Sequence, residues 1–430
     1  MRVVDALCVP GETGFFADDQ SAIRSGVGSD GFLYTGAAVT PGFDAVRQRG
    51  ESLLVLLVLE DGHVAQGDCA TVQYSGVGGR EPVFHAADAA RVLRRGVLPE
   101  LVGLEVGEDV VAVCAAVDAM VVDGEALPAA LRYGLSQALL DAAAHACGVT
   151  VAELVAQQWS TGVPIAAVPV YVQCGDDRYT NVDKMILKRV DVLPHGLINT
   201  VAKLGADGEV LATYVRWLRE RILAVAGDPA YRPVLHLDLY GTVGIIFGGD
   251  LERVADYLVR LGRLAAPFRL RVEHPVDAGS RDAQVTAFVA LRALLAEQDP
   301  RVELVVDEWC NTLEDIEVFV EARAADVVHV KTPDLGGLGN TIEALLLVRR
   351  AGLLGFAGGT CNETDVSAKL STQVAMACGA AQVLAKPGMG VDEGLMIVRN
   401  EMARTLALVG RRATAATATT TATTTTGVAR

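Results

Sequence analysis

Four charged residues in the second half of the chain each stand at the end of a short apolar run. They are Asp238 in LHLDLY, Glu273 in LRVEHP, Asp307 in LVVDEW and Lys331 in VVHVKTPD. The steps between them are 35, 34 and 24 residues, and each step suits one helix with its loops. If the runs are successive strands of a parallel barrel, the four side chains lie at the same level at one rim.

Three carboxylates that converge at one rim repel one another and raise each other's pKa unless a cation lies between them. Oxygen ligands on rigid strands favour Mg²⁺, which keeps its remaining positions for water or substrate. Any one of these acids could instead form an ion pair or cap a helix. Three in register, followed by a lysine, favour a metal site formed by Asp238, Glu273 and Asp307.

Lys331 is a candidate base. The two-residue period of a strand places His329 and Lys331 on the same face, pointing into the barrel. Lys331 could be no more than a charge partner for the carboxylates, but a nearby dication would disfavour its ammonium form and lower its pKa. A metal with a lysine base matches proton abstraction next to a carboxylate, in which Mg²⁺ stabilises the enediolate.

Two further strand ends carry polar side chains. His195 follows the run Val190–Pro194, and we expect it to face Lys331 across the barrel mouth. There it could serve a second epimer of the substrate or assist the leaving group, although a lone histidine is more often structural. Gln173 ends the run VPVYVQC.

A glycine pair opens another candidate binding segment, Gly358-Gly359-Thr360-Cys361-Asn362. Such a pair lets a ligand approach the backbone closely, and the Thr360 hydroxyl could hold a carboxylate. A tight turn without a ligand would have the same sequence. Cys361 is not expected to be a nucleophile, because no histidine is placed beside it by the sequence.

The elements that carry these residues follow from an alternation of strand-like and helical segments that begins near residue 165. This alternation is the signature of a parallel sheet, and eight strands indicate a closed (β/α) barrel. The eight runs are Val168–Gln173, Val190–Pro194, Val234–Tyr240, Phe268–Glu273, Val302–Asp307, Val327–Lys331, Leu353–Ala357 and Val383–Lys386.

Residues 1–160 lack this regular alternation of strands and helices and are predicted to form a separate α+β domain. Asp61-Gly62 between two apolar runs predicts a hairpin, and leucines at helical spacing predict a helix over Pro128–Cys147. The last 18 residues, almost all Thr and Ala, are expected to be disordered. The predicted division is therefore 1–160, 161–412 and 413–430.

Composition excludes several classes of function. The net charge of −16 argues against nucleic-acid binding. The longest aliphatic run, Leu53–Leu59, is far shorter than the ~20 residues that span a membrane. The first residues lack the apolar stretch of a signal peptide, so we expect a cytoplasmic protein. The eight cysteines include no C-x-x-C pair and are expected to be reduced thiols.

Several long strings resemble the methylaspartate ammonia-lyase family of the enolase superfamily, over residues 1 to about 412. They include MRVVDALCVPG, DGFLYTG, RQRGESLLVLLVLEDG, GDCATVQYSGVGGR, QCGDDRY, DVLPH, DLYGT, DEWCNTLED, KTPDLGG, GGTCNET and ACGAAQVLAKPGMGVDEGLMIV. The resemblance implies an α/β fold in which an N-terminal α+β capping domain closes over an enolase-type modified (β/α) barrel.

The resemblance also implies a reaction. Mg²⁺ would be held by Asp238, Glu273 and Asp307, and Lys331 would remove the C3 proton of (2S,3S)-3-methylaspartate. The products would be mesaconate and ammonia, on a route of glutamate degradation. Members of the family are typically homodimers, often with K⁺ beside Mg²⁺. Residues at the other matching positions are His195 as general acid/base on the opposite face, and Gln73, Gln173, Thr360 and Cys361 as substrate contacts.

One position departs from the family pattern. The family usually carries glutamine two residues before the catalytic lysine, where it contacts the metal-bound carboxylate, and this chain has His329. Histidine can also donate a hydrogen bond, but it differs in shape and charge. We therefore expect His329 to contact the substrate and to alter substrate preference or rate.

Two other functions are alternatives to the lyase. A cycloisomerase or epimerase of the same superfamily acting on an amino dicarboxylate usually carries K-x-K at the end of the second strand, where this chain has Leu193-Pro194-His195. A non-catalytic metal-stabilised scaffold would lose no measurable property on replacement of Lys331.

Overall fold

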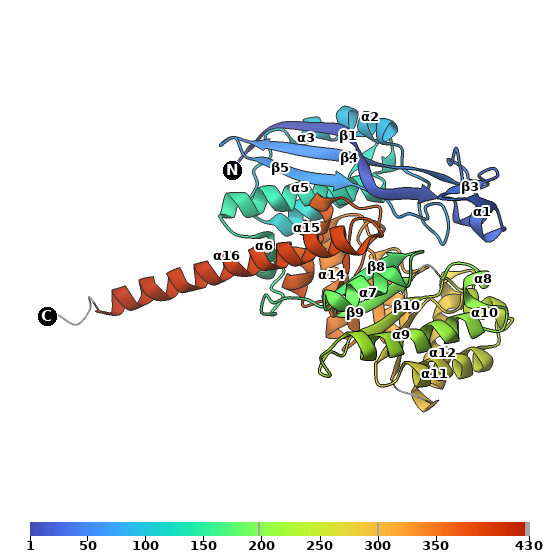
Figure 1. The fold of residues 1–430 in the computed structure, drawn as a ribbon. Helices are drawn as coiled ribbons and strands as arrows, with labels where there is room; N and C mark the ends of the chain where they lie inside the picture. The colour runs from blue at the N-terminus through green and yellow to red at the C-terminus, as the bar shows by residue number, and fades with distance from the viewer. Residues whose placement is uncertain (197, 299–300, 426–430) are drawn as a thin grey trace.

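The computed structural model describes residues 1–196, 198–298 and 301–425, with side chains described to residue 414. Figure 1 shows a layered N-terminal domain that lies across one end of a barrel, with a long C-terminal helix projecting from the side of the molecule. The chain thus has the α/β architecture that the sequence predicts, with an α+β cap on a closed barrel.

The capping domain is built on a three-stranded antiparallel sheet in the order β1-β4-β5, formed by β1 (Val3–Asp18), β4 (Arg47–Leu59) and β5 (Val64–Cys69). β4 and β5 form the predicted hairpin. The other elements of this part are α1 (Gln20–Arg24), β2 (Gly28–Asp30), β3 (Leu33–Thr35), α2 (Ala86–Gly96), α3 (Leu98–Leu101), α4 (Val110–Asp118), β6 (Val121–Val122), β7 (Glu125–Ala126), α5 (Ala129–Cys147) and α6 (Val151–Gln158).

Helix α5 packs against β5 at backbone distance. A Cβ atom added to Gly134 of α5 would lie 2.7 Å from the backbone nitrogen of Cys69, and one added to Gly67 would lie 2.1 Å from the Gly134 carbonyl oxygen. Side chains are absent on both sides of this contact, so the helix rests on the strand itself. Residues 53, 55, 57 and 59 of β4 complete the core under the helix, because alternate side chains of a strand share one face.

The barrel is closed by eight strands that all pair in parallel, in the order β10-β11-β12-β13-β14-β15-β8-β9. All eight predicted strands are present, including the one at the C-terminal end of the barrel. They are β8 (Val170–Gly175), β9 (Val192–Gly196), β10 (Val234–Asp238), β11 (Leu270–Glu273), β12 (Val302–Val306), β13 (Val327–Val330), β14 (Leu354–Ala357) and β15 (Gln382–Ala385).

The helices that follow the strands cover the outside of the barrel (Figure 1). Their apolar faces and the outer faces of the strands form the largest core cluster, and a smaller cluster around Tyr171 and Phe356 fills the barrel interior. These helices are α7 (Thr180–Leu187), α8 (Val201–Leu204), α9 (Glu209–Val225), α10 (Thr242–Ile246), α11 (Leu251–Ala265), α12 (Arg281–Gln298), α13 (Leu313–Glu321), α14 (Leu338–Arg350), α15 (Asp365–Cys378) and α16 (Val391–Thr425).

The C-terminal helix α16 runs to Thr425 and so enters the Thr/Ala-rich segment (Figure 1). Arg412 fixes this helix just before the segment through an ion pair with Glu153 of α6, with Nη2 and Oε2 2.6 Å apart. Disorder of the tail from Ala413 stays a prediction. The remaining residues, 426–430, lie outside the described part.

Within the described ranges, no single helix is both long enough and apolar enough to cross a membrane. Helices α5 and α6 satisfy length and composition only when they are taken together, and their axes are bent by 92°.

Replacement of Gly134 with alanine is expected to destabilise the capping domain by about 1–3 kcal/mol, because the new methyl group forces α5 away from β5. Urea denaturation followed by circular dichroism measures the effect. Gly410→Ala in α16 is the matched control, because no atom lies within 4 Å of the added Cβ. That control should be neutral or stabilising by up to about 1 kcal/mol. Equal losses in the two variants would contradict the tight α5–β5 contact.

Candidate active site at the carboxyl end of the barrel

The three predicted carboxylates lie at the ends of three neighbouring strands. Asp238 and Glu273 are the last residues of β10 and β11 and pair with each other in register. Asp307 directly follows β12. All three are at most 2% exposed. The barrel register therefore brings these acids to one rim, as their sequence spacing predicts.

Lys331 and His329 reach this cluster from the next strand, β13. The Lys331 Nζ atom lies 2.6 Å from Asp307 Oδ2, and His329 Nδ1 lies 2.7 Å from Glu273 Oε1. The Gly359 backbone N–H donates to the other ring nitrogen of His329 at 3.3 Å. Both ring nitrogens of His329 are thus engaged by protein groups, and burial keeps its pKa below the ordinary value, which favours the neutral ring.

His195 on β9 lies on the other side of the cluster, next to Asp238. Its Nε2 atom is 3.4 Å from Asp238 Oδ2. Burial alone would lower the pKa of His195, but the hydrogen bond and charge of Asp238, together with the charge of Glu273, outweigh burial and raise it. This arrangement favours a protonated imidazole near neutral pH.

The residues predicted to contact a ligand surround the same space. The Cys361 thiol donates to Gln73 Oε1 at 3.4 Å, and the Gln73 backbone N–H donates to the Thr360 hydroxyl at 3.2 Å. Gln173 of β8 donates from Nε2 to the Gly388 carbonyl. Gln73 comes from the capping domain and the other three from the barrel, so the site is composed of both domains.

These side chains line one narrow cavity of about 40 Å³. Nine of the ten predicted site residues line it: Gln73, Gln173, His195, Asp238, Asp307, His329, Lys331, Thr360 and Cys361. The tenth, Glu273, is completely buried behind them.

The cluster has the character of a cation site. The potential ligand atoms of Glu273, Asp307 and His329 all lie within 4.8 Å of one another. Asp238 lies outside that tight group and faces His195, but it is the neighbour of Glu273 in strand register. The two oxygens of Glu273 face the imidazoles of His329 and His236, at 2.7 Å and 2.8 Å. Buried carboxylate oxygens of this kind are the ligands that a hard divalent cation prefers.

The two central carboxyl groups, Glu273 and Asp307, have pKa values that are shifted in opposite directions. Burial, together with the charge of Asp238, raises the pKa of Glu273 to about 7. Burial would also raise the pKa of Asp307, but the ammonium group of Lys331 beside it and the guanidinium of Arg80 hold that pKa well below the usual range. Without a cation, therefore, the charge of Asp307 is balanced by Lys331 and Arg80, and Glu273 takes up a proton more readily than a free carboxyl group.

Arg80 is a site residue that the sequence reasoning missed. It belongs to the capping domain, yet its guanidinium is buried against the barrel, with Nε 2.7 Å from Asp334 Oδ2 and Nη2 3.4 Å from Asp307 Oδ1. A third carboxylate, Glu308, lies 3.8 Å from Nη1. The signal in the sequence is an arginine that ends a glycine-rich loop, SGVGGR. That pattern does not indicate which residues the arginine contacts.

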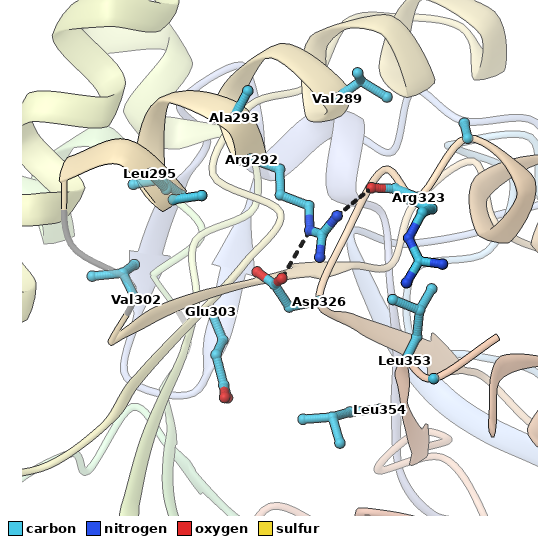
Figure 2. A pocket seen from close by; sticks show the side chains of 13 residues that line it. Val289, Arg292, Ala293, Leu295, Val302, Glu303, Arg323, Asp326, Leu353 and Leu354 are labelled. Atoms are coloured by element: carbon cyan, nitrogen blue, oxygen red, sulfur yellow. Dashed lines mark hydrogen bonds and ion pairs between the residues drawn. The ribbon is translucent and has the colours of Figure 1, made fainter.

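A larger pocket of about 570 Å³ lies elsewhere, at the amino ends of β12 and β14. Figure 2 shows Arg292 pointing toward Asp326 and toward the Arg323 backbone, so its charge is satisfied inside the wall of this pocket. None of the predicted site residues lines the pocket. The small cavity at the carboxyl end is therefore the candidate active site.

Comparisons with known proteins identify the family of the chain. Residues 1–160 match the family model "Methylaspartate ammonia-lyase N-terminus", and residues 162–411 match "Methylaspartate ammonia-lyase C-terminus". The chain is 53% identical to methylaspartate ammonia-lyase from Clostridium tetanomorphum over 413 residues, which cover 96% of this chain and 100% of that protein.

Two solved structures are similar over almost the whole chain. β-Methylaspartase from Clostridium tetanomorphum, solved as a Mg complex, superposes with a TM-score of 0.91 at 53% identity and covers 96% of this chain and 100% of that one. Methylaspartate ammonia lyase from Citrobacter amalonaticus, solved with (2S,3S)-3-methylaspartic acid, gives a TM-score of 0.92 at 48% identity. That comparison covers 95% of this chain and 100% of the other.

The pKa of Glu273 predicts how stability depends on pH in chelator-treated protein. A carboxyl group whose pKa is raised by folding, here from 4.5 to about 7, stabilises the fold fully below its unfolded-state pKa. That contribution is lost as the pH rises through the folded-state pKa. Thermal unfolding between pH 4 and pH 8 should therefore show a decline that Glu273→Gln flattens. Parallel pH profiles for wild type and Glu273→Gln would contradict this electrostatic account.

Proposed function

The chain belongs to the methylaspartate ammonia-lyase family of the enolase superfamily, and we propose that it eliminates ammonia from (2S,3S)-3-methylaspartate to give mesaconate. The observation that carries the proposal is the convergence of a buried lysine, a buried histidine and three carboxylates at the carboxyl end of one barrel. This set of groups provides a base, a second proton-transfer group and a cation site.

The residues proposed to hold Mg²⁺ are Asp238, Glu273 and Asp307, which lie at the ends of three neighbouring strands. The relative from Clostridium tetanomorphum was solved as a Mg complex, and the donor set here is rich in the oxygen atoms that Mg²⁺ prefers. Bound there, Mg²⁺ would offset the negative charge that holds the proton on Lys331 and would stabilise the enediolate formed from the substrate carboxylate.

Lys331 is proposed as the base that takes the C3 proton. Burial and the charge of Arg80 lower its pKa, but Asp307, Glu308 and Asp334 outweigh them and raise it. Lys331 is thus an ammonium group when these carboxylates are uncompensated. The balance of charge around Nζ therefore decides whether the amine is free to accept a proton.

His195 is proposed as the proton-transfer group on the opposite side of the substrate. Asp238 holds its Nε2 atom at 3.4 Å, and the raised pKa keeps a proton on the ring near neutral pH. In this position His195 can assist the departure of ammonia or exchange the proton of the other epimer.

Gln73, Gln173, Thr360, Cys361 and His329 are proposed to position the substrate. Burial raises the pKa of the Cys361 thiol to about 12, so Cys361 remains a neutral donor and not a nucleophile. His329 is already held by Glu273 and Gly359, which supports a role in orienting the carboxylate cluster beside the substrate.

We further propose that the enzyme is a homodimer that acts on this small-molecule substrate in the cytoplasm. The support is the family resemblance, together with eight cysteines that are all free thiols. Free thiols suit a reducing compartment.

The purified protein should release ammonia and a conjugated dicarboxylate from (2S,3S)-3-methylaspartate only when Mg²⁺ is present. Lys331→Ala should lower kcat by at least about 10³-fold, because the base is removed and the fold is retained. Ultraviolet absorbance follows the conjugated product, and a coupled assay follows ammonia.

Lys369→Ala is the matched control, since Lys369 forms an exposed ion pair with Asp365 on α15. It should leave turnover unchanged. Conversion of the (2S,3S) substrate to its other C3 epimer without ammonia release would indicate an epimerase instead. A wild-type protein with no metal-dependent reaction on methylaspartate or aspartate would refute the proposal.

His329→Gln should move the kinetics toward those of relatives that carry glutamine. An amide group then replaces an imidazole ring whose two nitrogen atoms are both hydrogen-bonded within the protein. We expect a change in KM of about threefold or more, in line with the loss or gain of one ~1 kcal/mol hydrogen bond. Steady-state kinetics on both epimers measures it. Unchanged parameters on both substrates would show that position 329 does not influence the bound substrate.

A further inference from the structure

A buried ion pair lies directly beneath the loop that carries Thr360 and Cys361, and the proposed chemistry does not use it. Lys386 follows β15, and Glu363 belongs to the loop. Lys386 Nζ lies 2.8 Å from Glu363 Oε1, and both side chains are 0% exposed. The pair is separate from the carboxylate cluster and from the cavity lining.

Every donor of the ammonium group has a partner. Besides Glu363, Lys386 donates to the Gly358 carbonyl at 2.7 Å and to the Thr332 hydroxyl at 3.1 Å. The second carboxylate oxygen of Glu363 accepts from the Tyr133 hydroxyl of α5 at 2.7 Å. One charge pair thus connects the loop to β15, to the residue that follows Lys331, and to the capping domain.

The loop rests on this pair so closely that only glycine fits above it. Gly359 has a φ of +137°, and a Cβ added there would lie 2.1 Å from Glu363 Oε1 and 2.4 Å from Lys386 Nζ. The Thr360 backbone N–H points to the same Glu363 oxygen at 3.3 Å. The charge pair therefore fixes the backbone on both sides of Gly359.

Three groups of the active site are attached to this fixed backbone. The Gly359 N–H holds His329, the Thr360 hydroxyl accepts from the backbone of Gln73, and Thr332 is the neighbour of Lys331 in the sequence. Burying two charges costs solvation that well-packed apolar side chains would not, so such a pair adds little to stability. Such a pair can instead hold its hydrogen-bond partners in one arrangement.

We propose that Lys386 and Glu363 are positioning residues of the lyase, which hold residues 358–361 and Thr332 in the arrangement that binds and deprotonates the substrate. The inference rests on the proposed function, because its effect is read out in turnover of 3-methylaspartate. It assigns a role in positioning to two residues that touch neither the substrate cavity nor the cation site.

Lys386→Met, Glu363→Gln and the double variant test the proposal. Each should lower kcat/KM by about 100-fold, the effect of misplacing reacting groups by about 1 Å, with a rise in KM as well as a fall in kcat. Each single variant should also lower the melting temperature, because it leaves one buried charge unpaired. The double variant removes both charges and should recover the melting temperature without recovering kcat/KM.

A merely structural role gives a different pattern, in which activity of the double variant returns together with stability. That result would overturn the inference, as would single variants that are folded and within about threefold of wild-type kcat/KM. Lys369→Met, at the exposed pair on α15, is the charge-matched control and should have no effect.

Tyr133→Phe keeps the test decisive if a charge variant does not fold. It removes one hydrogen bond to Glu363 and keeps both charges, so a folded protein with a several-fold loss of kcat/KM is expected. Wild-type kinetics in Tyr133→Phe together with unfolded charge variants would assign the pair to folding alone. An inactive wild type would instead refute the proposed function and is recognised in the same assay.

Discussion

Repulsion between carboxylates at the rim of the barrel is the constraint around which the rest of the site is arranged. The strand register sets Asp238 beside Glu273, and Asp307 follows on the next strand, all in the protein interior. Negative charges at such distances are tolerated only if each has a counter-charge or a proton. The fold supplies Lys331, Arg80 and His195 as positively charged or chargeable neighbours. It supplies His329 as a hydrogen-bond partner of Glu273.

The capping domain takes part in that balance and does more than cover the barrel. Arg80 brings a buried positive charge to Asp307 and Asp334, and Gln73 contacts the loop residues Thr360 and Cys361. Helix α5, which packs tightly on β5 within this domain, also reaches the barrel, because Tyr133 donates to Glu363. The relation between the two domains is therefore part of the site geometry.

The barrel and the positions of the charged residues at its rim could be predicted from the sequence because each is signalled locally. A parallel strand is a continuous apolar run, so the charged residue that ends it is conspicuous, as with Glu273 and Lys331. Arg80 and the pair of Lys386 with Glu363 gave no such signal, because their partners lie more than 20 residues away in the chain and are set by tertiary packing.

The wall of the cavity is shared between two domains, and this has a consequence for the shape of the site. Val72, Gln73, Tyr74 and Arg80 of the lining belong to the capping domain, and the other lining residues belong to the barrel. A small shift of the capping domain against the barrel would therefore change both the shape and the charge of the cavity. The carboxylate cluster would keep its place at the strand ends, while the groups that face it from the capping domain would move.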